Sequence, residues 1–458
     1  MKKFLDRWHA DKLNTLVSVL WLLTVFFSFL GGDVLQFRIP GVATLFPFRV
    51  LLPVTTLLYL IRAIVRKQNP WKTATFIQRL CYILCGILAV YGTASLAWAI
   101  DLSFSAPVWF TMCFDLVFFA LGIDLCRDRK LFTGTVCAVA AAIVVQILPG
   151  IYEVFCGGIL KTRFDGIFWM FGRTYTSPTF TTGNPNDYAM GLVFMLAVLL
   201  LYWAWQGHGE KGFRWIPVLL APVYFLICTT YGRLCMVAFW ILVAGIVLFA
   251  LTGKKTRGVL IAALLLLGVT VGVMHVGESV PMPWEDAQQV SSDPDNLKDE
   301  FFVVDEQTGE TQLNLSLSGG IRVDLLLHSM DCFLQSKGMG VGLGNTAQLA
   351  KVTAARRDNI WAIHCFLARM SADFGIWFLI PLLLIAFKML QFGVGYAIRG
   401  LRGRSWQNAL LGAFYLAAIL VFPVASTASG DAQNSLAMWL YLAAMVVLPA
   451  HIEKTSEL

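Results

Sequence analysis

Residues 188–206 read YAMGLVFMLAVLLLYWAWQ, a run of 19 residues without a charged side chain. A helix of this length rises about 1.5 Å per residue, which is enough to cross the apolar core of a bilayer, about 30 Å thick. Such runs recur along the 458-residue chain, which is 58% hydrophobic and only 14% charged, with a mean hydropathy of +0.70. Soluble domains are about 25% charged. The sequence therefore predicts an all-α, polytopic membrane protein in which residues 1–458 form one integral membrane domain.

Apolar segments long enough to span a membrane occur about twelve times in the sequence. They lie at about 14–31, 41–61, 80–100, 107–125, 131–152, 188–206, 214–231, 233–252, 258–275, 360–387, 408–424 and 435–450. The first run follows the basic start Met1-Lys2-Lys3, but it is longer than the apolar part of a signal peptide and lacks a small-x-small cleavage site. We therefore expect it to be a membrane span.

The positions of lysine and arginine predict how these spans are oriented. If the N-terminus is cytoplasmic and the spans alternate, the cytoplasmic segments hold 22 of the 35 Lys and Arg residues. Cytoplasmic loops of membrane proteins carry such a basic excess. Both termini are thus expected in the cytoplasm, and the long segments 153–187 and 276–359 are expected outside. The net charge of +7 follows from these loops and does not require nucleic acid as a partner.

The long outer loop 276–359 changes character along its length. The acidic tract from Glu285 to Glu310 has the composition of solvated, mobile chain. Between Ile321 and Gln335, apolar residues recur at helical spacing on one face: Val323, Leu326, Leu327, Met330, Phe333 and Leu334. This pattern predicts an amphipathic helix that lies along the outer membrane surface or against the bundle.

The outer loop 153–187 contains more basic residues than the positive-inside rule predicts for an outer loop. Arg163 and Arg173 are followed by Asn184-Pro185-Asn186-Asp187, directly before the span 188–206. Proline favours an extended turn at the residue before it, and Asn186 or Asp187 can cap the helix that follows. Basic groups beside a helix start suit an anionic ligand such as a phosphate.

Two further polar residues lie at the predicted outer boundary. Arg233 follows Thr229-Thr230-Tyr231-Gly232 between two spans, where an arginine either anchors a helix end or faces a polar site. His364 lies about one turn inside the span 360–387, and an interfacial histidine is either structural or an acid or base near neutral pH. Arg369 and Asp373, four residues apart, can form an ion pair. Asp373 falls opposite His364 on a helix, so it is not expected to orient that histidine.

Four alternating glycines, Gly338, Gly340, Gly342 and Gly344, precede this span. They do not follow the GxGxxG pattern, and no Gly-Lys-Ser/Thr follows them, so they do not indicate a nucleotide site. We expect a flexible turn that joins the amphipathic helix to the next span. The six histidines are dispersed and the ten cysteines form no CxxC pair, which does not predict a metal site or a disulfide framework.

Together, these residues resemble motifs of the O-antigen ligase and polymerase superfamily of bacterial membrane glycosyltransferases. The matching elements occur in the family's order: Arg173 with Asn184-Pro185-Asn186, Thr229 to Arg233 as a Ser-x-Ser-Arg element, Arg322 with Gly340-x-Gly-x-Gly-Asn345, and His364 with Gly375. The last pair follows the ligase pattern His-[Asn/Ser/Gln]-x9-Gly-x-x-Gly. Cys365 and Phe378 depart from that pattern, which leaves room for polymerase-like and teichuronic-acid-type relatives. The resemblance covers mainly residues 165–380.

The resemblance implies glycosyl transfer on the outer face of the bacterial cytoplasmic membrane, for the assembly of cell-surface polysaccharide. The donor would be a saccharide on undecaprenyl pyrophosphate, the acceptor a glycan or lipid-linked hydroxyl, and no cofactor or metal would take part. His364 would be the general base. The other implied roles are pyrophosphate binding by Arg173, Arg233 and Arg322, a substrate-binding loop shaped by Asn184, Asn186 and Asp187, and secondary phosphate contacts by Arg163, Arg356 and Arg357.

Three other functions are compatible with the same sequence. A repeat-unit polymerase would differ from a ligase only in its acceptor. A transporter or flippase for lipid-linked glycans would be expected to carry charges at mid-bilayer, where this chain has few: Arg49, Asp115 and Asp124. A receptor without enzymatic activity would use the acidic tract 285–310 to bind a partner.

Overall fold

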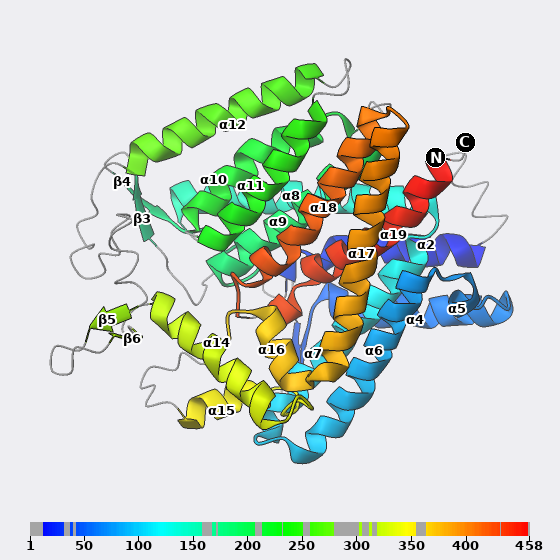
Figure 1. Ribbon diagram of the computed structural model, residues 1–458, viewed down its shortest axis with the longest axis vertical. Helices are drawn as coiled ribbons and strands as arrows, with labels where there is room; N and C mark the ends of the chain where they lie inside the picture. Colours follow the sequence, from blue (N-terminus) through cyan, green and yellow to red (C-terminus); the bar gives the residue numbers. More distant parts are fainter. Residues whose placement is uncertain are drawn as a thin grey trace.

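The computed structural model describes residues 12–31, 37–39, 43–157, 167–170, 173–206, 213–230, 232–250, 257–278, 302–304, 311–313, 318–353, 363–430 and 432–456. Over these ranges the protein is a bundle of helices, accompanied by three short antiparallel hairpins (Figure 1). The predicted all-α membrane fold is confirmed. Most of the acidic tract 285–310, and with it Arg163, Arg356 and Arg357, lies outside the described residues.

The helices of the first half are α2 Lys12–Ser28, α4 Pro47–Val65, α5 Pro70–Thr73, α6 Phe76–Ser95, the 3₁₀ turn η1 Leu96–Trp98, α7 Leu102–Leu125, α8 Arg129–Cys156 and α9 Pro185–Gln206. Those of the second half are η3 Ile216–Leu219, α10 Leu220–Thr229, α11 Arg233–Ala250, α12 Arg257–Glu278, α14 Ser318–Gln335, α15 Asn345–Thr353, α16 Phe366–Phe374, α17 Ile376–Arg402, α18 Trp406–Ser426, η5 Ala432–Asn434 and α19 Leu436–Ser456. The hairpins pair β1 Phe37–Ile39 with β2 Ala43–Leu45, β3 Ile167–Met170 with β4 Arg173–Thr176, and β5 Phe302–Val304 with β6 Thr311–Leu313.

Within the described ranges, eight helices are long and apolar enough to cross a membrane, and four shorter apolar helices accompany them. Every one of the twelve predicted spans coincides with one of these helices, although their boundaries differ. The protein is therefore a multi-pass membrane protein, as the uncharged runs predicted.

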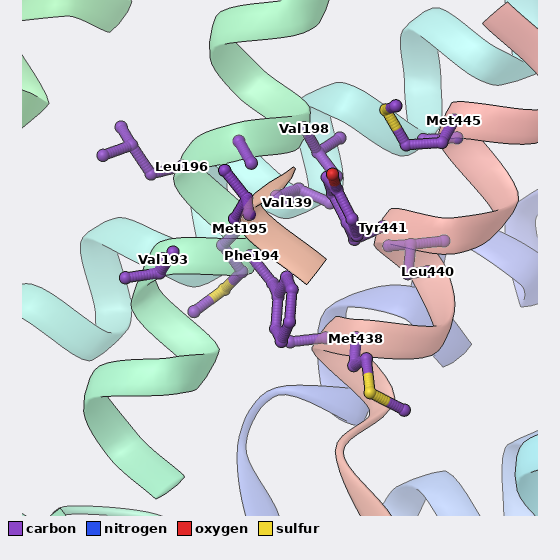
Figure 2. Packing of buried hydrophobic residues seen from close by; sticks show 14 of the residues in the cluster. Val139, Val193, Phe194, Met195, Leu196, Val198, Met438, Leu440, Tyr441 and Met445 are labelled. Carbon is purple, nitrogen blue, oxygen red and sulfur yellow. The ribbon is translucent and has the colours of Figure 1, made fainter. Parts of the chain in front are cut away.

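Helix α9, which contains the run 188–206, lies at the centre of the bundle. All its residues from Tyr188 to Ala204 except Gly191 are buried. A helix that is hydrophobic on every side is stable only when it is surrounded, and here α8, α11, α18 and α19 pack around it. Figure 2 shows Phe194 of α9 next to Tyr441 of α19, with their ring centroids 5.1 Å apart. Helices at the rim, such as α4, instead expose apolar side chains like Leu57.

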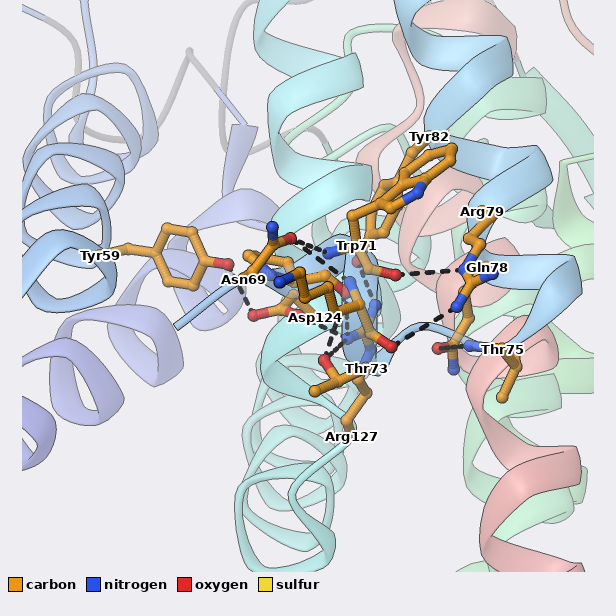
Figure 3. A network of polar contacts seen from close by, with 12 residues as sticks. Tyr59, Asn69, Trp71, Thr73, Thr75, Gln78, Arg79, Tyr82, Asp124 and Arg127 are labelled. Atoms are coloured by element: carbon orange, nitrogen blue, oxygen red, sulfur yellow. Dashed lines mark hydrogen bonds and ion pairs between the residues drawn. The ribbon is translucent and has the colours of Figure 1, made fainter. Parts of the chain in front are cut away.

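Polar contacts gather at both ends of the bundle. At one end, Asp124 of α7 accepts a hydrogen bond from Tyr59 Oη (2.6 Å) and pairs with Arg127 Nη1 (3.0 Å), as Figure 3 shows. Arg127 Nη1 also donates to Thr73 Oγ1 of α5 (2.8 Å). This network joins α4, α5 and α7 at the end where most of the predicted cytoplasmic lysines and arginines lie, which we call the basic end. The opposite end, which the sequence predicts to face outside and which we call the outer end, holds the candidate site residues.

The predicted span 360–387 is wrong in its first half. The helix is broken at Gly375, whose φ of +63° and ψ of −145° end α16 and begin α17. A side chain is strongly disfavoured in this conformation, so only the glycine, and not the surrounding apolar pattern, marks the break. Helix α17 then continues to Arg402, packed so closely against α18 that a Cβ at Gly412 would lie 2.6 Å from the backbone nitrogen of Ala397.

The predicted amphipathic helix is confirmed as α14. It packs on the bundle through Leu325, Ser329 and Cys332, which are all buried. At 100° per residue its exposed side divides into an apolar arc, represented by Met330 and Leu334, and a neighbouring polar arc that includes Asp331. Helix α14 thus presents one face to the protein, one apolar face outward and one polar face outward, as expected for a helix at a membrane surface.

An environment-sensitive fluorescent amino acid placed at Leu334 is therefore expected to be quenched by lipids brominated near the headgroup. The same residue placed at Asp331 is expected to be quenched much less, because it faces water. Both positions are exposed and belong to the same turn of α14, so each is the control for the other. Equal quenching at the two positions in proteoliposomes would show that the apolar arc does not contact lipid.

Candidate functional site

The first turn of α9 lies at the outer end and is organised by Asn184. Its side-chain Oδ1 accepts a hydrogen bond from the backbone N–H of Asn186 (2.9 Å), so Asn184 caps the helix. Pro185 follows as the first helical residue, a position where its missing N–H does no harm. The prediction that Asn186 or Asp187 caps this helix is wrong, because the helix begins at Pro185.

Asp187, in the same turn, contacts a segment far away in the sequence. Ser429 Oγ donates a hydrogen bond to the Asp187 carboxylate. Ser429 is buried and belongs to the connection between α18 and α19. Sequence reasoning missed this connection, although its polar run from Ser426 to Ser435 between two apolar segments marks it as unusual.

His364 does not lie inside a helix, as was predicted, but in a bend two residues before α16. The neighbouring Ile363 is buried in a small cluster with Leu325 of α14 and Ala350 of α15. Asp373 lies in α16 but His364 does not, so helical spacing does not determine how these two side chains are placed relative to each other. The backbone beside His364 is anchored between two outer helices, and His364 as a residue is partly exposed.

The α18–α19 connection also contacts the segment on the other side of His364. Thr427 Oγ1 lies 3.7 Å from Cys365 Sγ, a hydrogen-bonding distance for sulfur. Arg369 Nη1 of α16 donates to the carbonyl of Gly430 (3.1 Å). The connection that binds Asp187 thus also holds the start of α16. The structure thus brings Asp187 and Cys365, the neighbour of His364, to the same short connection.

Arg233 is the first residue of α11 and is exposed. The preceding residue, Gly232, is so close to α9 that a Cβ built on it would lie 3.4 Å from Cβ of Ala189. Helices α9 and α11 therefore begin side by side. This packing places Arg233 at the outer end beside the turn that carries Asp187.

Arg173 and Arg322 belong to elements at the outer end. Arg173 begins β4, which pairs with β3 and packs against α8; its side chain is outside the described part of the structure. Arg322 lies in the N-terminal part of α14 and is partly buried. Helix α14 in turn packs against α15 and α16, the helix that follows His364.

The glycine-rich turn is not a flexible joint before the next span, as was predicted; it connects α14 to α15 and is tightly held. Its backbone crosses the break between α16 and α17. Val341 N–H donates to the Ala372 carbonyl (2.9 Å), and Ile376 N–H donates to the Gly338 carbonyl (2.8 Å). A Cβ on Gly340 would lie 2.6 Å from the Asp373 carbonyl oxygen. Glycine is thus required here for close backbone approach, not for flexibility.

The other side of the glycine turn rests on the connection between α6 and α7. Trp98 Nε1 donates to the Val341 carbonyl (3.1 Å). Asn345 Oδ1 accepts from Ile100 N–H (3.0 Å), and Leu343 N–H donates to Ser95 Oγ (3.2 Å). The turn therefore lies between the α6–α7 connection on one side and the break between α16 and α17 on the other.

Asp373 completes this arrangement. Its buried carboxylate accepts hydrogen bonds from Gly344 N–H (3.1 Å), Thr346 N–H (3.2 Å) and Thr346 Oγ1 (2.6 Å). The predicted ion pair is confirmed, with Arg369 Nε 4.0 Å from Asp373 Oδ2. Burial raises the pKa of Asp373, and Arg369 and the hydrogen bonds act in the opposite direction. Asp373 thus anchors the start of α15, which is a structural role.

A second buried carboxylate, Glu153 of α8, holds the segment that leads into α9. It accepts from the backbone N–H groups of Thr179 (3.0 Å) and Phe180 (2.7 Å). Gln146, also on α8, donates through Nε2 to Thr181 Oγ1 (2.9 Å). Neither residue was a predicted candidate, although a glutamine inside an apolar run and a glutamate at its end were visible signals.

This segment forms one wall of a cavity of about 400 Å³, which we call the outer pocket. Its lining residues come from seven segments: Ser28, Phe29, Gly31, Phe46, Arg49, Thr111, Gln146, Thr181, Thr182, Asp187, Tyr188, Met190, Gly191, Leu192, Met195 and Asn434 to Ala437. Asp187 therefore belongs both to the predicted site and to this pocket.

The outer end combines a histidine with arginines at the helix boundary and a pocket that has both polar and apolar walls. An imidazole can take a proton near neutral pH, and arginines bind phosphate through paired N–H groups. No family model matches the chain, and no curated protein matches its sequence. Assignment of a function therefore depends on this geometry together with the short motifs.

Proposed function

We propose that the protein is a glycosyltransferase of the outer face of the bacterial cytoplasmic membrane. It transfers a saccharide from undecaprenyl pyrophosphate to a hydroxyl group of a glycan or lipid-linked acceptor. The observation that carries the proposal is that Asp187 and Cys365, the residue next to His364, both contact the connection between α18 and α19. Asp187 directly follows one matching motif and Cys365 lies in another, so two motifs far apart in the chain meet in this way at one end of a membrane bundle.

The position of these residues suits a lipid-linked donor. The polyprenyl chain stays in the bilayer, so the pyrophosphate and the first sugar lie at the membrane boundary. The candidate residues lie at helix ends or directly beside them: Asp187 at the start of α9, Arg233 at the start of α11, and His364 before α16. A site at this level can reach the reacting bond while the lipid remains inserted.

The proposed reaction is a substitution at the anomeric carbon of the donor sugar. The acceptor oxygen forms a bond to that carbon as the bond to the pyrophosphate oxygen breaks. His364 takes the proton of the acceptor hydroxyl, and the bonding electron pair leaves with the lipid-linked pyrophosphate. Arg173, Arg233 and Arg322 bind the pyrophosphate and offset its growing charge.

The acceptor distinguishes a ligase from a polymerase. Purified protein in proteoliposomes would receive a lipid-linked glycan donor together with either a second lipid-linked repeat unit or a different glycan acceptor. Chain growth on the repeat unit identifies a polymerase, and transfer to the other acceptor identifies a ligase. Movement of the donor between leaflets without transfer to any acceptor would contradict the proposal and identify a flippase.

In this assay Arg233→Ala is expected to lower kcat/KM for the donor about 10- to 100-fold. The reason is the loss of hydrogen bonds to a charged group, which contribute about 1.5–3 kcal/mol. Arg233→Lys keeps the charge, so its kcat/KM is expected to lie between that of the wild type and that of Arg233→Ala. Arg402→Ala removes an exposed arginine at the basic end of α17 and is the matched control, with wild-type activity expected. Wild-type kcat/KM in Arg233→Ala would remove Arg233 from the proposed site.

A further inference from the structure

The outer pocket is a cavity that extends from the outer end into the helix bundle. Its mouth is formed by the starts of α4, α9 and α19, together with the segment before α9. Gln146 hydrogen-bonds to Thr181 and therefore lies beside the segment before α9. Thr111 and Met195 line the inner part of the pocket, nine and ten residues from the outer ends of α7 and α9. At a rise of 1.5 Å per residue, this corresponds to a depth of about 14 Å.

The chemistry of the wall is unusual for a cavity among membrane helices. Hydroxyl, amide and carboxylate groups line it from separate segments: Thr111, Thr181, Thr182, Asp187, Asn434 and Ser435. Apolar residues such as Leu192 and Met195 line the rest. Hydroxyls and amides both donate and accept hydrogen bonds, as sugar hydroxyls do, and apolar surface suits the C–H faces of a sugar ring. The hydroxyls of Thr111 and Thr182 donate to backbone carbonyls, so their oxygens remain able to accept a hydrogen bond from a ligand.

Arg49 supplies a cation at the mouth of the pocket. It lies in the first turn of α4, with its guanidinium carbon 4.9 Å from the ring centroid of Phe46 and 5.9 Å from that of Phe110. The buried carboxylate of Asp115 on α7 is near enough to interact with it electrostatically. An arginine in the first turn of a membrane helix either extends its guanidinium to the interface or faces a polar site, and Arg49 is among the residues that line the pocket. Its planar fork of donors is held in orientation by the two rings.

The wall opposite Arg49 is held rigidly by the contacts of Glu153 and Gln146 with the segment before α9. Within this segment Phe180 has a φ of +27°, a conformation that costs a non-glycine residue free energy. Its backbone N–H donates to the fully buried Glu153 carboxylate, which helps to keep it there. A strained segment clamped by a buried carboxylate gives the pocket a preformed shape, as small-molecule sites usually have.

We propose that the outer pocket is a saccharide subsite, which binds one sugar unit of the lipid-linked glycan through its hydroxyl groups, with Arg49 as a specificity-determining residue. The proposal rests on the proposed function for the nature of the glycan. It adds a binding site and a residue outside every motif that suggested that function. Asp187, which contacts both the pocket and the α18–α19 connection, links the subsite to the segment that carries His364.

Occupancy of the pocket can be tested without measuring catalysis. Thr182→Cys places a thiol at an exposed position on the pocket lining, where a membrane-impermeant thiol reagent can reach it. Labelling above that of the unsubstituted protein is measured in proteoliposomes, with and without lipid-linked glycans extracted from the cells that make the protein. The glycans are expected to reduce labelling at least fivefold, and Arg49→Gln is expected to restore it. Undiminished labelling in the presence of glycan would overturn the subsite.

Kinetics provide the second readout. Arg49→Gln is expected to raise KM for the glycan at least tenfold and to leave kcat within threefold of wild type. The matched control is Arg66→Gln, at the opposite end of α4, which is expected to leave both constants unchanged. If Arg49→Gln does not fold, Thr111→Val, which removes one lining hydroxyl at constant shape, is used in its place with a severalfold rise in KM expected. An unchanged KM in the folded variant overturns the role of the pocket.

The two proposals fail differently. Transfer by the wild-type protein without glycan protection of Thr182→Cys would overturn the subsite and leave the glycosyltransferase proposal standing. Protection without transfer to any acceptor would support the subsite and contradict the reaction.

Discussion

The His364→Gln variant is expected to keep its fold and its KM for the donor, but to transfer sugar about 10²- to 10⁴-fold more slowly than the wild type. General base catalysis by a positioned side chain contributes this much, and glutamine keeps a polar side chain of similar reach that cannot take up the proton. His364 is partly exposed, and its backbone is anchored by Ile363 on one side and the Cys365 contact on the other. Replacing the side chain therefore leaves the anchoring contacts in place.

The pH dependence distinguishes a base from a structural histidine. A base must be neutral to accept a proton, so wild-type kcat is expected to fall at acid pH. In His364→Gln this acid limb is expected to disappear from the residual rate. His328→Gln, which removes a histidine of α14 at the same end, is the control and should keep the acid limb. Wild-type kcat in His364→Gln would exclude His364 as the base.

Gly375→Ala is expected to destabilise the protein by about 2–5 kcal/mol and to abolish transfer. Gly375 has a φ of +63° and a ψ of −145°, where a side chain is strained. In addition, a Cβ would lie 2.2 Å from the carbonyl oxygen of Gly338 and 2.4 Å from the carbonyl carbon of Met339. Both contacts are to backbone, which is held by the hydrogen bond from Ile376 and cannot move aside without breaking it.

The measurement is thermal unfolding in detergent together with the yield of monodisperse protein. Gly395→Ala is the matched control, because it lies in the same helix α17 and an added Cβ there meets no heavy atom within 4 Å. Alanine is favoured over glycine inside a helix, so this variant should be as stable as the wild type or slightly more stable. A Gly375→Ala protein with wild-type stability would mean that the backbone crossing is looser than these distances indicate.

The lengths of the uncharged segments were sufficient to predict the membrane helices. Each segment that crosses a bilayer must be long and apolar by itself, whatever the rest of the chain does. Residues 188–206 are an example. Their length predicts a span, and their lack of any polar face fits the central position of α9. The ion pair of Arg369 and Asp373 was also predictable, since it depends only on local helical spacing.

The site was less predictable, because its contacts join segments that are distant in the chain. Nothing near Asp187 indicates that Ser429 is its partner, 242 residues later. The break at Gly375 was missed inside the predicted span 360–387, although Arg369, Ser371 and Asp373 precede it. Because α16 begins only at Phe366, His364 lies in a bend. Arg49 was noted only as an embedded charge, and its position at the mouth of a pocket depends on packing among several helices.

The hydrogen bond from Ile376 N–H to the Gly338 carbonyl also has a consequence for biosynthesis. The first N–H groups of a helix have no partner within the helix, and here the acceptor comes from a residue made 38 positions earlier (376 − 338). The ribosome therefore delivers the glycine-rich turn before the helix that needs it. When α17 leaves the ribosome, the chain that completes its start has already emerged. The hydrogen bond at the start of α17 can therefore form as soon as α17 has been synthesised.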